Sequence, residues 1–383
     1  LRERQEDDQI VIVVSAMGDT TDDLVGLAKQ VTNKPYGREM DRLLCTGEQV
    51  TISLMAMAFE TRGQKAISMT GAQAGIKSSD AFNKGRILGV EPGRVFEALD
   101  AGNIVVVAGF QGITEDGDMA TLGRGGSDTT AVALAGAMKA DVCEIFTDVD
   151  GVYSTDPRVC PKAEKLPEIT YGEMLEMARL GAGVMQPRAV EMGLRYGVPI
   201  HVRSTFTSDQ GTIIREDYTM EHNKRVIRGV ADDKNAAKVS LIGVENKPGV
   251  AAKVFKALAA HNVDVDMIVQ SIRSNNDAKT DIVFTVMNDD VPQAKEIIDE
   301  IHKEINIDDI NIDEDVAKVS VVGAGMLGQP GVAAQMFDIL GQEGINVEII
   351  STSEISITCL VKEERVKDAV KAIHEKLFFA ERG

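Results

Sequence analysis

Cysteine is scarce in this chain of 383 residues, and so is positive charge. The cysteines lie far apart and form no C-x-x-C pair: Cys45, Cys143, Cys160 and Cys359. This spacing argues against a disulfide framework or a zinc site and favours a reduced, cytoplasmic protein. Lysine and arginine number 41 against 60 for aspartate and glutamate, which gives a formal net charge of −19. Because nucleic acids and anionic membranes bind basic surfaces, we expect neither as a partner.

Long apolar runs and catalytic histidine motifs are also missing. The longest apolar runs, such as 10–14 and 104–108, have the length of strands and are far too short to span a membrane. The five histidines are isolated, without an H-E-x-x-H motif, so neither zinc hydrolysis nor a histidine triad is indicated. No signal peptide is visible, and the sequence opens on Leu1 without a methionine, so we expect the natural N-terminus to lie upstream.

Short β-rich runs alternate with longer helical patterns in the first half of the chain. We predict helices at 21–30, 47–60, 92–101 and 130–138, and strands at 10–14, 65–69, 104–108, 142–146 and 200–203. Continuous runs of valine and isoleucine are typical of strands that are buried on both faces. Strands separated by helices imply crossover connections. The predicted fold of residues 1–215 is therefore α/β, with a mostly parallel central sheet and helices on both faces.

The second half contains an internal repeat with a period of about 80 residues. Lys238-Val-Ser-Leu-Ile-Gly243 recurs as Lys318-Val-Ser-Val-Val-Gly323, and Pro248-Gly-Val-Ala-Ala252 recurs intact from Pro330. Each copy predicts a small β-α-β-β-α unit, the first at 236–313 and the second at 314–383. The polar stretch 216–235 predicts a linker, in which the strand-like run 226–230 could complete the sheet of the second copy.

A glycine-rich stretch at 121–130 is the most informative motif. Three glycines allow backbone amides to surround an anion, and Arg124 adds a fork suited to a carboxylate or phosphate. Ser127 or Asp128 could cap a helix that starts near Thr129, whose N-terminus favours negative charge. The stretch therefore predicts an anion site, with an ordinary glycine-rich turn as the alternative. Another pair of glycines, at 71 and 75, does not have the spacing of a P-loop.

Two further acidic motifs flank predicted elements. Asp148 and Asp150 follow the strand at 142–146, at the edge where open α/β sheets bind ligands. They could hold a metal or contact a nucleotide ribose, or they could form an acidic turn. Glu48 opens the helix at 47–60, where the helix dipole alone would explain a carboxylate.

Taken together, these segments resemble the aspartokinase family. The resemblance rests on 13–22, 46–48, 70–75, 123–128 and 147–153, while the repeated Pro-Gly units resemble its paired ACT regulatory domains. It covers essentially the whole chain. It implies an amino-acid kinase fold followed by two α+β ferredoxin-like ACT units. The implied reaction is the ATP-dependent phosphorylation of the side-chain carboxylate of L-aspartate, the first step toward lysine, threonine and methionine.

The resemblance also implies site residues. Arg124 would hold the α-carboxylate of aspartate and Glu48 its ammonium group, in a pocket also lined by Thr21, Ser127 and Asp128. The nucleotide, ATP with Mg²⁺, would be held by Thr147, Asp148, Tyr153, Arg158, Gly183 and Val184, and no side chain is assigned as a metal ligand. The sequence departs from the family in two ways. It starts after the Lys-Phe-Gly-Gly-Thr segment whose lysine contacts the phosphates, and Gly183 stands where several relatives carry a lysine.

Feedback control by lysine, threonine or both is implied as well. Amides at the helix that follows each Pro-Gly could accept an amino acid's carboxylate, and acidic residues on the next strand could take its ammonium group. We expect the effector site at a homodimer interface, lined by Asn246, Asp264, Val265, Asp266, Gln270, Ala333, Ala334, Val347, Glu348 and Glu354. A separate regulatory subunit from the same gene is left open as a further partner. The alternative functions are a non-catalytic amino-acid sensor and another amino-acid kinase.

Overall fold

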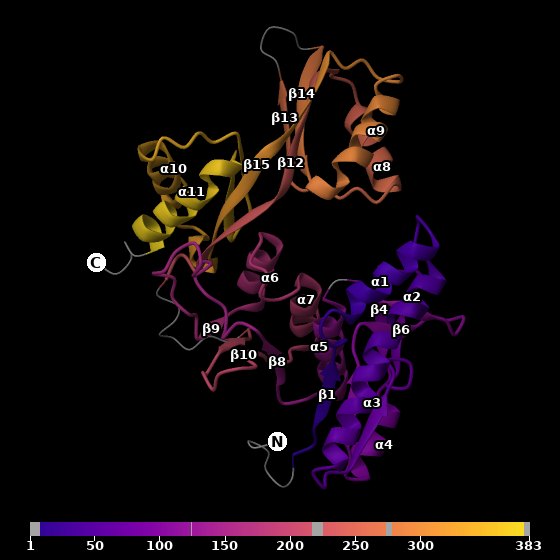
Figure 1. Ribbon diagram of the computed structural model, residues 1–383. Helices are drawn as coiled ribbons and strands as arrows, with labels where there is room; N and C mark the ends of the chain where they lie inside the picture. The colour runs from indigo at the N-terminus through magenta and orange to yellow at the C-terminus, as the bar shows by residue number, and fades with distance from the viewer. Residues whose placement is uncertain (1–7, 124, 217–224, 273–277, 379–383) are drawn as a thin grey trace. The chain divides into compact units, whose positions relative to one another are not determined.

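The computed structural model describes residues 8–123, 125–216, 225–272 and 278–378. The chain divides into two compact units (Figure 1). The first unit comprises Leu1–Val152, Pro167–Leu175 and Gly183–Tyr218, and the second comprises Tyr153–Leu166, Glu176–Ala182 and Thr219–Gly383. Two short segments from the first half of the sequence thus belong to the second unit. The domain limits expected from the sequence remain a prediction.

A parallel sheet with helices on both faces forms the core of the first unit. Its strands are β1 (Val11–Val14), β5 (Ile104–Ala108) and β2 (Ala66–Met69), in the order β1-β5-β2. Every residue of β5 is buried, as its run of valines predicts. Alternate β5 side chains pack in two apolar clusters, one with α3 (Thr46–Glu60) and the other with α4 (Gly93–Asp100) and α5 (Gly126–Met138). The predicted helices on both faces are therefore confirmed.

Two further sheets complete the first unit. In one, β8 (Cys143–Thr147) lies parallel to β10 (Ile200–Ser204), and β11 (Thr212–Ile214) and β9 (Glu168–Ile169) follow. The other has the order β4 (Ile87–Val90), β3 (Ile76–Ser78), β6 (Gln111–Ile113) and β7 (Met119–Thr121). The remaining helices are α1 (Thr20–Val31), α2 (Arg38–Leu44), α7 (Pro187–Tyr196) and α6 (Tyr171–Arg179), which has residues in both units.

Helix α5 starts earlier than the sequence suggests. It begins at Gly126, and its N-cap residue is Gly125 in the left-handed conformation, with φ of 66°. The expectation that Ser127 or Asp128 caps the helix is wrong, because both residues already lie in its first turn. In the described chain, no side chain makes a capping hydrogen bond there.

A single six-stranded antiparallel sheet runs through the second unit. Its order is β13-β14-β12-β15-β17-β16. The strands are β12 (Gly229–Glu245), β13 (Ile268–Ile272), β14 (Lys279–Val286), β15 (Asp309–Val322), β16 (Ile349–Thr352) and β17 (Ser356–Lys362). The helices are α8 (Val250–Ala260), α9 (Val291–Ile301), α10 (Val332–Gln342) and α11 (Val366–Ile373). Both predicted β-α-β-β-α repeats are present.

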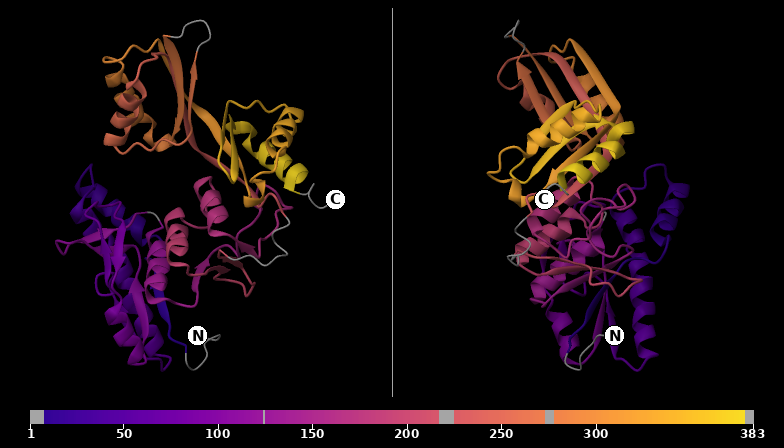
Figure 2. Two further views of the ribbon diagram at one scale, coloured as in Figure 1. Left: turned by 180° about the vertical axis from the view of Figure 1, so that it is seen from behind. Right: turned by 90° about the vertical axis from the view of Figure 1, so that its left-hand side faces the viewer.

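Two long strands serve both repeats (Figures 1 and 2). The beginning of β12 pairs with the end of β15, where Gly229 lies opposite Val322. The other end of β12 pairs with β14 of the first repeat, where Leu241 lies opposite Ile282. Val230, from the run predicted to complete the second sheet, is buried in the core of the second repeat. The repeats therefore exchange strands and do not fold as two separate sheets.

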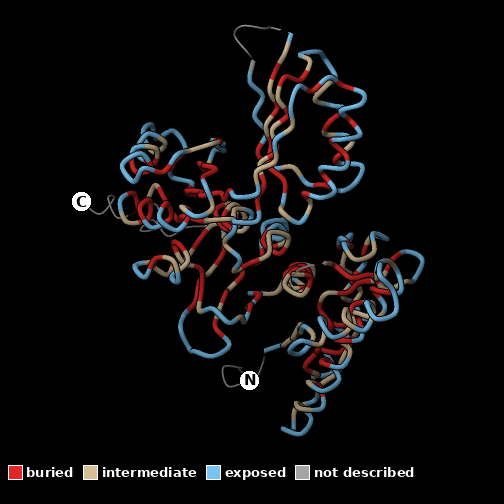
Figure 3. Tube along the Cα trace, turned by 45° about the horizontal axis from the view of Figure 1, so that its top comes forward, coloured by how far each residue is buried: buried red, intermediate tan, exposed pale blue. Residues whose placement is uncertain are grey.

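Each repeat nevertheless has a core of its own. Val254, Leu258 and Phe284 belong to the first core, whereas Leu340 and Val370 belong to the second. In Figure 3 the helices of the first repeat carry both buried and exposed residues, as expected of helices that cover one face of a sheet. Among the described helices, none combines the length and the apolar composition needed to cross a membrane.

Candidate active site

The carboxyl ends of β1 and β5 meet the N-terminus of α5. Because β1 and β5 are parallel neighbours, both end at the same edge of the sheet. Gly109 directly follows β5, and a Cβ atom on it would lie 2.8 Å from Oγ of Ser127 in the first turn of α5. Only a glycine allows this close approach. The free amides at the start of α5 are thereby brought to the edge where the two strands end.

Glu48 reaches the same edge from the first turn of α3. The backbone amide of Ala16, just beyond β1, donates a hydrogen bond to Oε1 of Glu48 at 3.1 Å. The Glu48 residue is only 3% exposed. Burial raises the pKa of its carboxyl, and hydrogen bonds from the amides of Glu48 and Ala16 oppose that rise. Its second oxygen, Oε2, is buried and has no hydrogen-bond partner in the described part of the chain.

The other predicted substrate residues lie around this edge. Ser127 and Asp128 belong to the first turn of α5, and Thr21 to the first turn of α1, which follows β1. Burial raises the pKa of the Asp128 carboxyl above its usual range. Arg124 lies outside the described residues, so the prediction of its role rests on the sequence alone.

A buried carboxylate that the sequence did not single out fixes the strand before Arg124. Asp41 of α2 is completely buried and accepts hydrogen bonds from the amide and hydroxyl of Thr121, at 2.7 and 2.8 Å. It also accepts bonds from the backbone amide and side-chain amide of Asn83, at 2.9 and 2.5 Å. Four donors therefore converge on one side chain. Thr121 is the last residue of β7, three positions before Arg124, so Asp41 anchors the entry to the glycine-rich stretch.

Residues at the start of α7 hold the same stretch from another side. The guanidinium of Arg188 donates to the carbonyl oxygen of Leu122 at 3.1 Å. A Cβ atom on Gly125 would lie 1.7 Å from Cγ of Gln186, so a side chain at Gly125 is excluded. Among the predicted nucleotide residues, Gly183 and Val184 lie in the turn just before these two residues. The glycine-rich stretch and this turn are therefore neighbours.

The remaining nucleotide residues follow β8. Thr147 ends β8, and its hydroxyl donates a hydrogen bond to the exposed Asp148 at 3.0 Å. Tyr153 and Arg158 belong to the second unit. There the Arg158 guanidinium contacts both oxygens of Asp156, with Nη2 2.8 Å from Oδ2 and Nε 3.0 Å from Oδ1. These bonds hold the pKa of the Asp156 carboxyl below its usual range.

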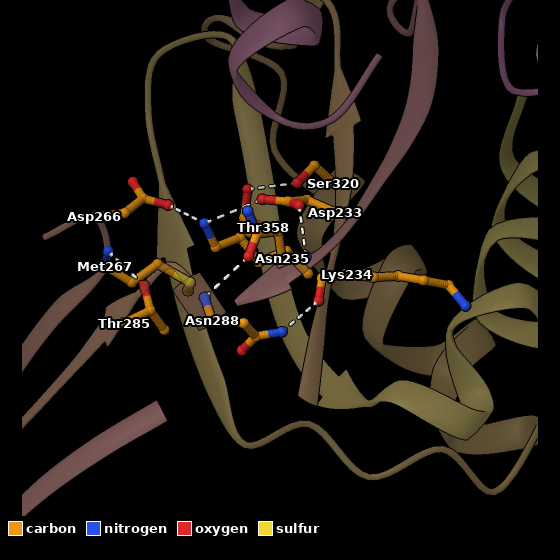
Figure 4. Close-up of polar contacts among 10 residues, drawn as sticks. Asp233, Lys234, Asn235, Asp266, Met267, Thr285, Asn288, Ser320 and Thr358 are labelled. Atoms are coloured by element: carbon orange, nitrogen blue, oxygen red, sulfur yellow. Dashed lines mark hydrogen bonds and ion pairs between the residues drawn. The ribbon is translucent and has the colours of Figure 1, made fainter. Parts of the chain in front are cut away.

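Two predicted effector residues take part in ion pairs between the repeats. Nζ of Lys318 on β15 lies 2.5 Å from Asp266, just before β13, and 3.6 Å from Asp233 on β12. Lys318 has only 8% of its side chain exposed, whereas Asp266 has 59%. Figure 4 shows Asp266 and Asp233 in this network, together with neighbouring hydrogen bonds of β12 and β17. A lysine of the second repeat thus neutralises an acidic residue of the first.

The reverse pair is also present. Lys238 on β12 contacts Glu348, just before β16, and its Nζ lies 3.7 Å from Asp313 on β15. Lys238 and Lys318 occupy equivalent positions in the sequence repeat, as do Asp266 and Glu348. The pairs therefore cross between the repeats with approximate twofold symmetry. The sequence repeat alone does not predict this pattern, because the paired residues belong to different repeats and lie 52 and 110 positions apart.

The other predicted effector residues lie around the edge strands β13 and β16. Gln270 is on β13, and Asn246, Asp264 and Val265 lie in the connections on either side of α8. Ala333 and Ala334 are in the first turn of α10, while Val347 and Glu354 flank β16. The described residues contain no group of three or more His, Cys, Asp or Glu side chains that could hold a metal ion. All four cysteines are buried thiols without a disulfide.

Comparison with known proteins explains this arrangement. The model of the amino acid kinase family matches residues 1–204, and ACT domain models match residues 239–306 and 319–377. The aspartokinase of Mycolicibacterium smegmatis is 50% identical over 370 residues, which are 96% of this chain and 87% of that protein. The aspartokinase of Bacillus sp. strain MGA3 is 48% identical over 98% of this chain and 90% of its own length. The chain belongs to the aspartokinase family.

Solved structures agree with the family. E. coli aspartokinase III, crystallised with aspartate and ADP in its R-state, superposes with a TM-score of 0.77 at 27% identity, over 94% of this chain and 80% of that one. The aspartate kinase of Clostridium acetobutylicum gives a TM-score of 0.71 at 26% identity, over the same shares. As an aspartokinase, the chain phosphorylates the side-chain carboxylate of L-aspartate with ATP. The predicted fold and reaction are confirmed, whereas the roles of individual site residues remain predictions.

Proposed function

We propose that this aspartokinase binds L-aspartate where β1 and β5 end against α5, with Glu48 taking the substrate's ammonium group. The proposal rests on Oε2 of Glu48, which is buried and lacks a hydrogen-bond partner among the described residues. A buried carboxylate with one unpaired oxygen is unfavourable unless a cation completes it. An ammonium group supplies both the missing donor and the missing positive charge.

The other groups of the proposed site bind the two carboxylates of aspartate. Arg124 binds the α-carboxylate through its fork of donors. The side-chain carboxylate is already ionised at neutral pH, since its ordinary pKa is about 4, so attack on ATP needs no general base. The difficulty is to bring two anions together. The N-terminal amides of α5, beside Ser127, favour negative charge at this place and stabilise it as it redistributes during transfer.

The nucleotide is bound as its magnesium complex. We assign its contacts to Thr147, Asp148, Tyr153, Arg158, Gly183 and Val184. Magnesium in kinases is held largely by substrate phosphates and water, with one or two carboxylates, so the ion arrives as part of the substrate. The enzyme works in the cytosol, where its buried thiols stay reduced.

We propose in addition that lysine, threonine or both inhibit the enzyme at a homodimer interface. Strands β13 and β16 are the two edges of the sheet formed by the described chain, and unpaired edges are templates for pairing with a second chain. Asp266 and Glu348 lie beside these edges. An effector's ammonium group would replace Lys318 or Lys238 as the partner of each carboxylate. Binding changes catalysis by favouring one arrangement of the subunits over another.

The substrate proposal is tested by comparing aspartate with succinate, which lacks the ammonium group. In Glu48→Gln, kcat/KM for aspartate should fall about 100-fold, because a buried contact between charged groups contributes roughly 3 kcal/mol. The turnover of succinate should stay unchanged. Glu60→Gln at the exposed end of the same helix is the matched control and should behave as wild type. An equal loss for both substrates would assign Glu48 a purely structural role.

The regulatory proposal is tested by inhibition curves. Asp266→Ala should weaken inhibition by lysine or threonine and leave uninhibited turnover nearly intact. Sedimentation should show a dimer whose association is strengthened by the effector. Calorimetry with ATP separates an enzyme from a pure amino-acid sensor, because a sensor would bind lysine and ignore the nucleotide. Curves for Asp266→Ala that overlay those of wild type would remove this residue from the effector site.

A further inference from the structure

The stretch that carries Tyr153 and Arg158 is built into the second unit. Residues 153–166 follow β8 in the sequence, yet they fold with the ACT repeats. Tyr153 bridges to Lys165, and the amide of Ser154 donates to the carbonyl of Glu164 at 2.8 Å. The amide of Val230, at the start of β12, donates to the carbonyl of Ser154 at 2.7 Å. The segment thus forms a hairpin-like loop attached to the beginning of β12.

A buried histidine connects this loop to the segment that follows α11. His374 follows α11 directly and is completely buried. Its Nε2 lies 2.8 Å from Oγ of Ser154, and its Nδ1 lies 3.4 Å from Sγ of Cys160. The ring stacks on Phe378, with centroids 4.8 Å apart and planes 13° from parallel. Both ring nitrogens therefore contact the loop, and one face of the ring packs on Phe378.

The protonation state of the ring fits these two contacts. Burial lowers the pKa of His374, while the nearby Glu164 and Glu375 oppose the shift, so the ring is neutral at physiological pH. A neutral imidazole offers one donor and one acceptor. Ser154 and Cys160 can each either donate or accept, so both contacts are satisfied together. The Ser154 hydroxyl oxygen also accepts the amide of Glu164 at 2.9 Å.

The positions of the two contacts give His374 a role beyond filling the core. Ser154 directly follows Tyr153, and Cys160 comes two residues after Arg158. The ring therefore contacts the loop on both sides of Arg158, at Ser154 before it and at Cys160 after it. Val159, next to Cys160, packs against the core of the second repeat. A histidine that only filled the core would not need polar contacts with the loop on both sides of Arg158.

We propose that His374 is a positioning residue for nucleotide binding, through which the last helix of the second ACT repeat fixes the stretch that carries Tyr153 and Arg158. The inference rests on the proposed nucleotide role of those two residues. It assigns His374 no contact with ATP. On this proposal, the fold of the second ACT repeat sets the position of Tyr153 and Arg158.

The test is steady-state kinetics of the whole enzyme carrying His374→Phe. Phenylalanine keeps a ring that can stack on Phe378 and removes both ring nitrogens. The KM for ATP should rise about tenfold, because that factor corresponds to the free energy of one or two hydrogen bonds. The KM for aspartate should stay unchanged. Glutamine, which can still reach Ser154, should recover part of the affinity. Phe378→Leu is the matched control, because it loosens the same core and leaves the ring nitrogens in place.

A second variant keeps the test decisive if His374→Phe does not fold. Ser154→Ala removes a single oxygen and should raise the KM for ATP in the same direction. The effect of the double variant should be smaller than the sum of the two single effects, because the contact between His374 and Ser154 is lost in both. Arg158→Ala tests the underlying nucleotide role by itself. If Arg158→Ala raises the KM for ATP and neither other variant does, the positioning role is refuted. If none of them does, the nucleotide assignment also fails.

Discussion

Replacing Asp41 tests most directly how the glycine-rich stretch that carries Arg124 is held in place. In Asp41→Ala, four donors lose their acceptor, and two of them are the backbone amides of Asn83 and Thr121. Leaving a buried amide unpaired costs about 1–3 kcal/mol. We therefore expect the first unit to lose about 4 kcal/mol of stability, a large part of the 5–15 kcal/mol that is usual for a domain.

Amide hydrogen exchange measures this loss at the two residues concerned. A loss of about 4 kcal/mol corresponds to roughly a thousandfold faster exchange at Asn83 and Thr121. The KM for aspartate should rise as well, because Thr121 leads into Arg124. Asp41→Asn should be intermediate, since it keeps one acceptor oxygen. Asp116→Ala, in the exposed turn between β6 and β7, is the control and should leave both amides protected.

Weak effects of Asp41→Ala would contradict the role assigned to this carboxylate. If both amides stay protected in Asp41→Ala and stability falls by less than about 1 kcal/mol, the hydrogen bonds of Asp41 are replaced by water at little cost. A loss of stability with an unchanged KM for aspartate would separate the two claims. Asp41 would then support the fold without positioning the glycine-rich stretch for aspartate binding.

Further predictions concern single residues. Arg124→Ala should raise the KM for aspartate and lower kcat with less effect on the KM for ATP, and unchanged aspartate kinetics would remove Arg124 from the site. Gly125→Ala should lower kcat/KM for aspartate at least about tenfold, because φ is 66° and the space is filled by Gln186, and adding Gln186→Ala should restore part of the loss. Burial raises the pKa of Cys45 to about 12, so this thiol should react with a chromogenic disulfide only after unfolding in urea, and fast reaction of the native enzyme would contradict its burial. Burial lowers the pKa of His374, so the unfolded chain binds the extra proton first. The second unit should therefore lose stability as pH falls below about 6.5, and thermal unfolding of His374→Gln should show a flatter profile.

Local patterns were enough to predict most elements of the fold. The run of valines in β5 was recognisable because burial on both faces imposes a continuous apolar run. The Lys-Val-Ser segments were recognisable because they recur in the sequence. The start of α5 was predicted too late, because glycines at 125 and 126 suggest a loop, whereas a left-handed Gly125 here begins the helix. Strand β15 runs across the boundary at 313–314 that the sequence suggests between the two repeats. Pairing with β12 keeps it continuous.

Contacts between distant residues account for what the sequence could not show. Glu48 was recognised because it belongs to a motif, but its unpaired oxygen depends on Ala16 and on burial. Asp41 is one of 60 acidic residues, and its partner Thr121 lies 80 positions away. No periodicity or spacing rule connects such a pair. The same holds for His374, whose partners precede it by more than two hundred positions.

The exchange of strands between the repeats sets the order in which the chain can fold during synthesis. The beginning of β12 leaves the ribosome before the whole first repeat, yet its partner at the end of β15 is made only afterwards. The nascent chain therefore carries an unpaired strand end while the first repeat forms. Residues 153–166 wait longer still, because His374 follows its partners Ser154 and Cys160 by more than two hundred positions. A stop codon shortly before His374 would release a chain that has every described strand of its kinase half but no anchor for the loop that carries Tyr153 and Arg158.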